Sequence, residues 1–240
     1  MPPIRSILVD FDGTACPQDV SEALLDVFGD PAWRDLDAEV ERGWIGLRAA
    51  IRGQAAMLSA SREEMLAHAL DRYAVDPTFP PFVRWAGSVG LHLAVVSDGF
   101  AFYIGPMLEA AGVGHLEVIS NATAFPEGRP SLSHPNGHPV CVGCGTCKML
   151  AAQRFRERHG TVAFVGEGLS DRFGALYSDI VFAKDRLVSL CQLDRVPFVA
   201  WGDFDDVRRC LEDLRASGRE PPGPVDPATC PGWRTDEAER

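Results

Sequence analysis

The sequence has few basic residues for its length. Its 240 residues include 23 lysines and arginines against 34 aspartates and glutamates, which gives a formal net charge of -11. A general nucleic-acid-binding protein needs a basic face, so this shortage argues against that class and predicts no nucleic-acid partner. A small phosphorylated substrate is still possible, because a metal ion and one or two local cations can outweigh the overall negative charge.

Long apolar runs are absent as well. No stretch reaches the ~20 apolar residues that a bilayer-spanning helix requires, and no apolar signal-peptide segment precedes the first predicted strand. We therefore expect a cytoplasmic protein without a membrane partner. The seven cysteines should then be mostly reduced, and their odd number fits poorly with a complete disulfide framework.

Short apolar runs alternate with helical patterns along most of the chain. Apolar residues make up 46% of the sequence, enough for a packed core. Runs rich in branched residues predict buried strands, and the segments between them have helical spacing. This alternation predicts an α/β fold with a mostly parallel, Rossmann-like sheet. The predicted strands lie at 7–9, 91–96, 116–120, 161–165, 179–183 and 197–200.

Three segments interrupt this alternation. Residues 16–79 show helical spacing from about residue 24 to residue 73, no strand signal and a predicted capping box from Ser61 to Glu64. We therefore expect a helical cap inserted after the first strand. Residues 121–146 are rich in proline, glycine, histidine and cysteine, which predicts a flap within the core domain. Residues 217–240 carry many prolines and charges and are predicted to be a poorly ordered tail. The core domain would comprise residues 1–15 and 80–216.

Two carboxylates follow the first predicted strand, one residue apart. Residues 7–9 lead directly into Asp10, Phe11 and Asp12, and Gly13 then marks a turn. In parallel sheets, ligands bind just beyond the carboxyl ends of the strands. Two acids at that edge repel each other unless a cation or a shared proton compensates. The pair therefore predicts either a magnesium site or acid–base chemistry.

Other polar segments are expected at the same edge. Ser97 follows the second strand, Lys148 begins a predicted helix, and residues 166–171 follow the fourth strand. Together with Asp10 and Asp12, these segments resemble, in order, the four motifs of the haloacid dehalogenase superfamily of phosphatases, over about residues 4–215. The resemblance implies that Asp10 is the nucleophile that forms an aspartyl-phosphate, and that Asp12 is the general acid and base. It also implies phosphate binding by Ser97, Asp98, Gly99 and Lys148. Mg²⁺ would be bound by Asp10, the backbone carbonyl of Asp12, Glu167 and Asp171.

The fourth motif departs from the family pattern, because Glu167 stands where an aspartate is usual. Magnesium tolerates geometric error poorly, so the extra methylene is expected to affect metal affinity and rate more than the reaction class.

The predicted cap is similar to the C1-type cap of the phosphoserine phosphatase-like branch, subfamily IB. Residues 121–148 and 181–187 resemble a group within it, the methionine-salvage phosphatases of 2-hydroxy-3-keto-5-methylthiopentenyl-1-phosphate and the phosphatases of phosphocholine and phosphoethanolamine. By this resemblance, Asp19 would face the substrate. Glu22 and Arg48 are further candidates in the cap, and ordinary solvated charges are the alternative for all three.

A compact cysteine cluster occupies the end of the predicted flap. Two residues separate each of Cys141, Cys144 and Cys147 from the next, and His138 lies just upstream. These residues could supply four zinc ligands, although structural zinc motifs usually offer two separated pairs. Zinc, a disulfide and free thiols all remain open at this point.

The predicted function is a Mg²⁺-dependent phosphomonoester hydrolase that acts on a small phosphorylated metabolite, of the methionine-salvage type or a related one. A phosphotransferase is one alternative. The other is a non-catalytic phosphate-ligand-binding protein, which only Glu167 favours. Either a monomer or a homodimer fits the sequence.

Overall fold

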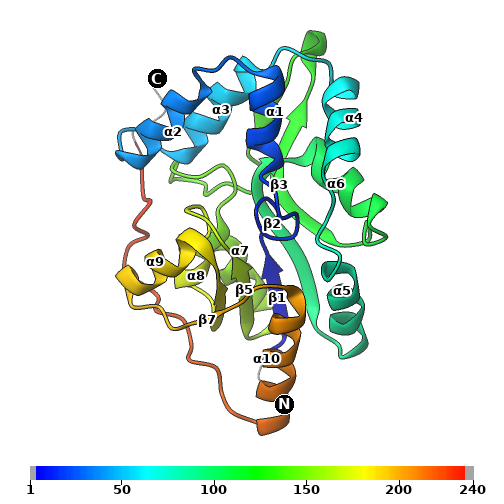
Figure 1. The fold of residues 1–240 in the computed structure, drawn as a ribbon. Coiled ribbons are helices and arrows are strands. Elements are labelled where there is room, and N and C mark those ends of the chain that lie inside the picture. The colour runs from blue at the N-terminus through cyan, green and yellow to red at the C-terminus, as the bar shows by residue number, and fades with distance from the viewer. Residues whose placement is uncertain (1–3, 236–240) are drawn as a thin grey trace.

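Residues 4–235 are described by the computed structural model, and their centre is a seven-stranded sheet (Figure 1). The strand order is β4-β3-β2-β1-β5-β6-β7, and only the β3–β4 pair is antiparallel. The predicted α/β fold is confirmed. The strands are β1 (Ser6–Val9), β2 (His92–Phe100), β3 (Glu117–Ala124), β4 (Ser131–Ser133), β5 (Val162–Gly166), β6 (Ile180–Ala183) and β7 (Phe198–Ala200).

Helices cover both faces of the sheet, because successive strand residues point to opposite sides. In β1, Ile7 and Val9 are fully buried in one apolar cluster, while Leu8 is fully buried in the other. The first cluster includes α5 (Phe79–Ser88), α6 (Ala101–Ala110) and α10 (Phe204–Ser217). The second includes α7 (Lys148–His159), α8 (Arg172–Leu176) and α9 (Asp185–Asp194). Burial on both sides explains why the strands read as continuous apolar runs.

Four helices fill most of the predicted cap segment. They are α1 (Val20–Phe28), α2 (Trp33–Glu41), α3 (Leu47–Met57) and α4 (Arg62–Arg72). Asp19 caps α1 by accepting the Glu22 N–H at 2.9 Å, and Ser61 and Glu64 form the predicted capping box of α4. Figure 1 shows α1, α2 and α3 beyond the carboxyl ends of the central strands. The cap therefore faces the edge of the sheet where the polar loops lie.

The flap begins as a hairpin that extends the sheet. β3 continues to Ala124 and pairs with β4, with a 3₁₀ turn, η1 (Pro126–Gly128), between them. The remainder, up to residue 147, has no regular structure and leads directly into α7.

The tail differs from its prediction over the residues that the structure describes. After α10 the chain passes α8 and returns to the flap and cap, as Figure 1 shows in orange and red. The Val225 N–H donates to the Leu176 carbonyl at 3.0 Å, and the Val142 N–H donates to the Arg234 carbonyl at 2.8 Å. Cys230 is buried. Composition suggested little order, but these long-range contacts supply it. Residues 1–3 and 236–240, at the ends of the predicted core and tail, lie outside the described residues.

No helix within residues 4–235 combines the length and the apolar content needed to cross a bilayer.

Candidate active site

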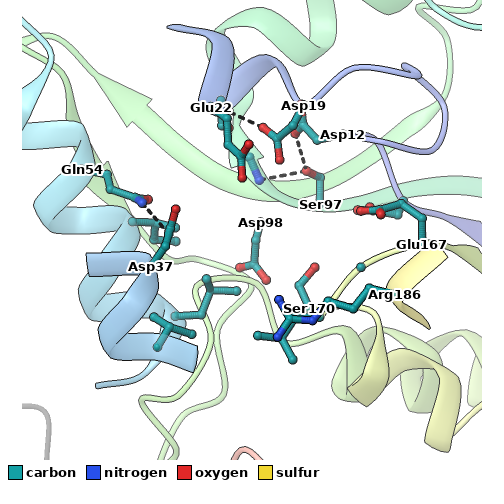
Figure 2. Close-up of a pocket in the computed structure, with 18 of the residues that line it drawn as sticks. Asp12, Asp19, Glu22, Asp37, Gln54, Ser97, Asp98, Glu167, Ser170 and Arg186 are labelled. Carbon is teal, nitrogen blue, oxygen red and sulfur yellow. Dashed lines mark hydrogen bonds between the residues drawn. The ribbon is translucent and has the colours of Figure 1, made fainter. Parts of the chain in front are cut away.

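Three neighbouring strands bring the predicted motifs to one place. β2, β1 and β5 are adjacent and parallel, so Asp10, Ser97 and the loop after Gly166 meet at their carboxyl ends. Together with the cap, they enclose a cavity of about 370 Å³ (Figure 2). That size is within the range of small-ligand sites.

Lys148 is a buried cation between two carboxylates. It is the first residue of α7 and is 1% exposed. Its Nζ donates to Asp10 Oδ1 at 2.6 Å, to Asp171 Oδ1 at 2.7 Å and to Ser170 Oγ at 2.9 Å. Burial lowers the pKa of Lys148, but the carboxylates of Asp10 and Asp171 outweigh that effect and hold it above its ordinary value. Lys148 therefore keeps a fixed positive charge beside Asp10.

Asp10 and Asp12 lie in different surroundings although one residue separates them. Asp12 Oδ1 accepts the Val20 N–H at 2.9 Å, and its Oδ2 accepts the Tyr103 hydroxyl at 2.7 Å. Burial raises the pKa of Asp12 to about 6, against these hydrogen bonds, which lower it. Burial also raises the pKa of Asp10, and the nearby Asp171 adds to the effect. A carboxyl that titrates near neutrality can give and take a proton, which suits acid–base work at Asp12.

Tyr103 is a site residue that sequence reasoning missed. It is fully buried in α6, and its hydroxyl contacts both Asp12 and Ser21, the latter at 2.7 Å. A buried tyrosine hydroxyl needs a hydrogen-bond partner, which was the available signal. The partner lies 91 positions away in the chain, so no local pattern could identify it.

Gly99 is required by a close approach of side chains. Ser97 Oγ accepts the Gly99 N–H at 2.8 Å and donates to Asp12 Oδ2 at 3.5 Å. A Cβ at Gly99 would lie 2.3 Å from the Tyr103 hydroxyl and 2.4 Å from Asp12 Oδ2. The missing side chain is what allows Asp12 and Tyr103 to meet beside Ser97.

Asp98 ties the flap to the site. Its Oδ1 accepts the Thr146 N–H at 2.6 Å, and its backbone carbonyl accepts from Asn121 Nδ2 at 2.6 Å. Asp98 lines the cavity, and its buried Oδ2 has no hydrogen-bond partner among residues 4–235. Its predicted contact with phosphate stays a prediction.

Three carboxylates form a group that suits a divalent cation. Ligand oxygens of Asp10, Glu167 and Asp171 lie within 4.8 Å of one another, and Mg²⁺ prefers such hard oxygen donors. Asp171 Oδ2 is held by the N–H groups of Glu167 and Gly168, each at 2.9 Å. Asp12 is not in this group, since Val20 and Tyr103 hold its carboxylate. The predicted role of Asp12 in metal binding was through its backbone carbonyl, so that role stays a prediction.

Glu167 lies against Gly13 at the entrance to this carboxylate group. A Cβ at Gly13 would lie 2.8 Å from the Glu167 carboxyl carbon, and Gly13 has a φ of +72°, a conformation that favours glycine. Burial, with the charge of Asp171, raises the pKa of Glu167 to about 7. A bound cation would relieve this repulsion, so the chemistry of the residues fits the predicted metal.

The cap wall of the cavity is acidic. Asp19, Glu22, Asp37 and Glu41 line it, while Arg186 is the basic residue of the lining. Gln54 is 6% exposed and donates from Nε2 to Asp37 Oδ1 at 2.7 Å (Figure 2). Burial raises the pKa of both Glu22 and Asp37, and the charge of Asp37 contributes to the shift at Glu22.

Arg48 is placed differently from its prediction as a substrate residue. It does not line the cavity. Its Nε donates to the Cys144 carbonyl at 2.8 Å and an Nη donates to the Cys141 carbonyl at 3.2 Å, so it joins α3 to the flap. Carbonyls at the end of the flap satisfy the guanidinium, a pairing between distant segments that the sequence does not reveal.

The chain matches the family model of haloacid dehalogenase-like hydrolases over residues 7–173. That match spans more than half of the chain. The chain belongs to this family. The predicted superfamily is thereby confirmed.

Two curated relatives refine the family. The chain is 32% identical over 212 residues to the bifunctional enzyme MtnB/MtnX of Bacillus licheniformis, covering 86% of this chain and 49%, about half, of that protein. It is 24% identical over 212 residues to the 2-hydroxy-3-keto-5-methylthiopentenyl-1-phosphate phosphatase of Brevibacillus brevis, covering 87% of this chain and 96% of that one. The family and the relative named as a phosphatase together support an enzyme of the phosphatase class.

A solved structure shares the fold. The phospho-aspartyl intermediate analogue of phosphoserine phosphatase aligns with a TM-score of 0.65 at 16% identity, over 88% of this chain and 98% of that chain. At that identity the likeness concerns the fold alone.

Proposed function

We propose that the protein is a Mg²⁺-dependent phosphomonoester hydrolase that works through an aspartyl-phosphate on Asp10. The observation that carries the proposal is the pairing of Asp10 with Lys148 at 2.6 Å, beside a second carboxyl, Asp12, with a pKa of about 6. Asp10 can attack, Asp12 can transfer a proton and Lys148 can stabilise negative charge. These are the functions that phosphoryl transfer requires.

The reaction runs in two steps. An Asp10 carboxylate oxygen attacks phosphorus and the bond to the substrate oxygen breaks, while Asp12 gives its proton to the leaving alkoxide. Asp12 then takes a proton from water, which attacks the phosphorus, releasing phosphate and restoring Asp10. Ser97 and Lys148 bind the phosphate oxygens and stabilise their charge during both steps.

Asp10, Glu167 and Asp171 would hold the metal, which when bound supplies positive charge to the phosphate oxygens. These three carboxyl groups lie near a single fixed cation, Lys148. A bound metal ion would offset the repulsion that remains between them, which supports this assignment.

The test is hydrolysis of a generic aryl phosphate with and without Mg²⁺, for the wild type and for Asp10→Asn. We expect turnover that needs Mg²⁺ and a loss of at least ~10³-fold in the variant, because the nucleophile is gone. Full turnover by Asp10→Asn would refute the assignment of Asp10 as the nucleophile. An acceptor-dependent phosphorylated product would indicate a phosphotransferase instead. Tight phosphate-ligand binding without turnover of any metabolite would indicate a binding protein.

The names of the relatives support a methionine-salvage-type substrate, but the acidic cap wall favours a second candidate. Glu22 and Asp37 would face the part of the substrate remote from its phosphate. Gln54, which is 6% exposed and lines the cavity, adds an amide oxygen to this wall. A phosphomonoester with a cationic nitrogen would neutralise this wall, and a primary ammonium group would also donate hydrogen bonds to these oxygens.

A metabolite panel separates the two candidates. Phosphoethanolamine and phosphocholine are compared with neutral phosphomonoesters of similar size, in the wild type and in Asp37→Asn. If the preferred substrate carries a cationic group, the variant raises KM for the ammonium substrates by about tenfold and leaves KM for the neutral substrates nearly unchanged. A preference for neutral substrates in the wild type would favour the methionine-salvage type.

A further inference from the structure

Four cysteines from two distant segments gather at a second, smaller cavity. Cys141, Cys144 and Cys147 lie at the end of the flap, and Cys230 belongs to the tail. Each is 7–9% exposed, and all four are free thiols. The cavity shares no lining residue with the active site. The tail thus brings a fourth sulfur to a cluster that the sequence shows as three.

Backbone N–H groups point at these sulfur atoms. Cys141 Sγ accepts the Gly143 N–H at 3.4 Å from its own loop and the Arg234 N–H at 3.2 Å from the tail. Cys141 Sγ in turn donates to the Gly232 carbonyl at 3.7 Å, which places the Cys230 segment of the tail against the flap. A neutral thiol is a weak acceptor, whereas a metal-bound thiolate gains from such donors around it. The turn at Cys141 therefore has the form of a metal-binding turn, and the tail supplies a second donor to the same sulfur.

The donor set suits a soft or borderline metal ion. Four thiolates are a standard ligand set for Zn²⁺, which structural sites hold as a closed tetrahedron. His138 is less suited than Cys230, because its Nδ1 already accepts the N–H groups of Val140 and Cys141, at 3.1 and 2.9 Å. The sulfurs are less tightly grouped than the 4.8 Å of the active-site carboxylates, so binding would draw the two loops together.

We propose that Cys141, Cys144, Cys147 and Cys230 bind one structural Zn²⁺ that fastens the tail to the flap. The site fills all four positions with protein sulfur and leaves none for substrate, so its role is architectural.

Zinc binding at these cysteines would also affect the active site, because the cluster is linked to it along the chain. Cys147 directly precedes Lys148, and the carbonyls of Cys141 and Cys144 hold Arg48 of the cap. The metal would fix the start of α7, and with it the cation beside Asp10.

The first test is the metal content of the full chain purified without chelator. We expect about one zinc per chain by mass spectrometry of the metals, released when a mercurial reagent titrates the thiols. Replacing it by Co²⁺ should give the intense absorption of a four-thiolate site, a readout that needs no variant. Absence of bound zinc, even after addition of Zn²⁺ alone, would overturn the proposal. So would a disulfide among the four cysteines in the unreduced protein.

Variants identify the fourth ligand. Cys230→Ser should bind Zn²⁺ at least ~100-fold more weakly, since even changes around a metal's ligands cost 10–100-fold. Cys210→Ser, on α10 and outside the cluster, is the matched control and should bind as the wild type does. Equal zinc affinity in Cys230→Ser would refute the assignment of Cys230. These measurements do not depend on phosphatase activity, so the two proposals fail separately.

Discussion

At the scale of residues, the site separates two chemically identical side chains by their partners. Lys148 holds Asp10, whereas Tyr103 and the Val20 N–H hold Asp12. Both carboxyls are buried, and burial raises the pKa of each. Different partners therefore give one acid a fixed cation and leave the other free to exchange a proton.

Tyr103→Phe tests the proton-transfer role of Asp12. The Tyr103 hydrogen bond lowers the pKa of Asp12, which burial sets at about 6, so its loss should raise that pKa. As a general acid, Asp12 must be protonated, and activity falls as pH rises through its pKa. The alkaline limb of kcat/KM that reports this acid should therefore move to higher pH by about one pH unit.

The control for this prediction is Tyr177→Phe, whose hydroxyl donates to the Pro227 carbonyl at 3.1 Å. Its pH profile should match that of the wild type. An unmoved limb in Tyr103→Phe would mean that another group supplies the proton.

Glu167→Asp tests the departure from the family pattern. If Glu167 binds the metal, the shorter aspartate should suit Mg²⁺ better and lower the Mg²⁺ concentration for half-maximal activity by up to about tenfold. Titration of activity with Mg²⁺ measures this. Glu157→Asp, on the exposed side of α7, is the control. A higher Mg²⁺ requirement in Glu167→Asp would show that the site is adapted to glutamate.

At the scale of elements, the adjacent ends of β1, β2 and β5 create the site. Parallel pairing places Val9 beside Val95 and Val165, so the residues that follow them emerge together. β2 carries Ser97 and Gly99 inside the strand, where its register against β3 shifts between Val96 and Phe100. This irregular end turns the polar groups of β2 towards Asp12.

Gly99→Ala tests how tightly this strand end is packed. The new Cβ would overlap the Asp12 carboxylate and the Tyr103 hydroxyl. We expect a stability loss of about 1–3 kcal/mol from overpacking and a fall in kcat/KM of at least ~10²-fold. Thermal unfolding and steady-state kinetics measure the two effects.

Gly87→Ala is the matched control, because a Cβ at Gly87 in α5 would meet nothing within 4 Å. It should leave activity unchanged and stabilise the helix by up to about 1 kcal/mol. If both variants behaved alike, steric contact at Gly99 would not be the cause.

At the scale of the whole molecule, cap and core meet across the cavity. Arg186 at the start of α9 pairs with Glu41 at the end of α2, with 2.9 Å between Nη1 and Oε1. Both side chains line the cavity and are about half exposed. The pair joins the two parts of the molecule that enclose the cavity.

Glu41→Gln should loosen this closure. Exposed ion pairs contribute about 0.2–1 kcal/mol, so KM should rise by no more than about fivefold, and the difference should shrink at high salt. Asp26→Asn, which breaks the Arg34–Asp26 pair within the cap, is the control and should leave KM unchanged. A salt-independent KM in the wild type would count against an electrostatic link.

The sequence by itself determined the sheet and where the candidate catalytic residues lie along the chain. Branched apolar runs predicted the strands, and turn residues after them predicted where Asp10, Ser97 and Glu167 emerge. These are short-range signals, because the alternation of strand and helix follows from local periodicity and the topology of parallel sheets then places the strand ends together.

Only the tertiary structure decided which side chains meet across long distances in the chain. It placed Tyr103 on Asp12, turned Arg48 towards the flap and brought Cys230 to the three clustered cysteines. Such contacts depend on the rotation of a helix about its axis and on the path of an irregular segment. Neither is encoded in a local pattern, since both result from packing against residues that are far away in sequence.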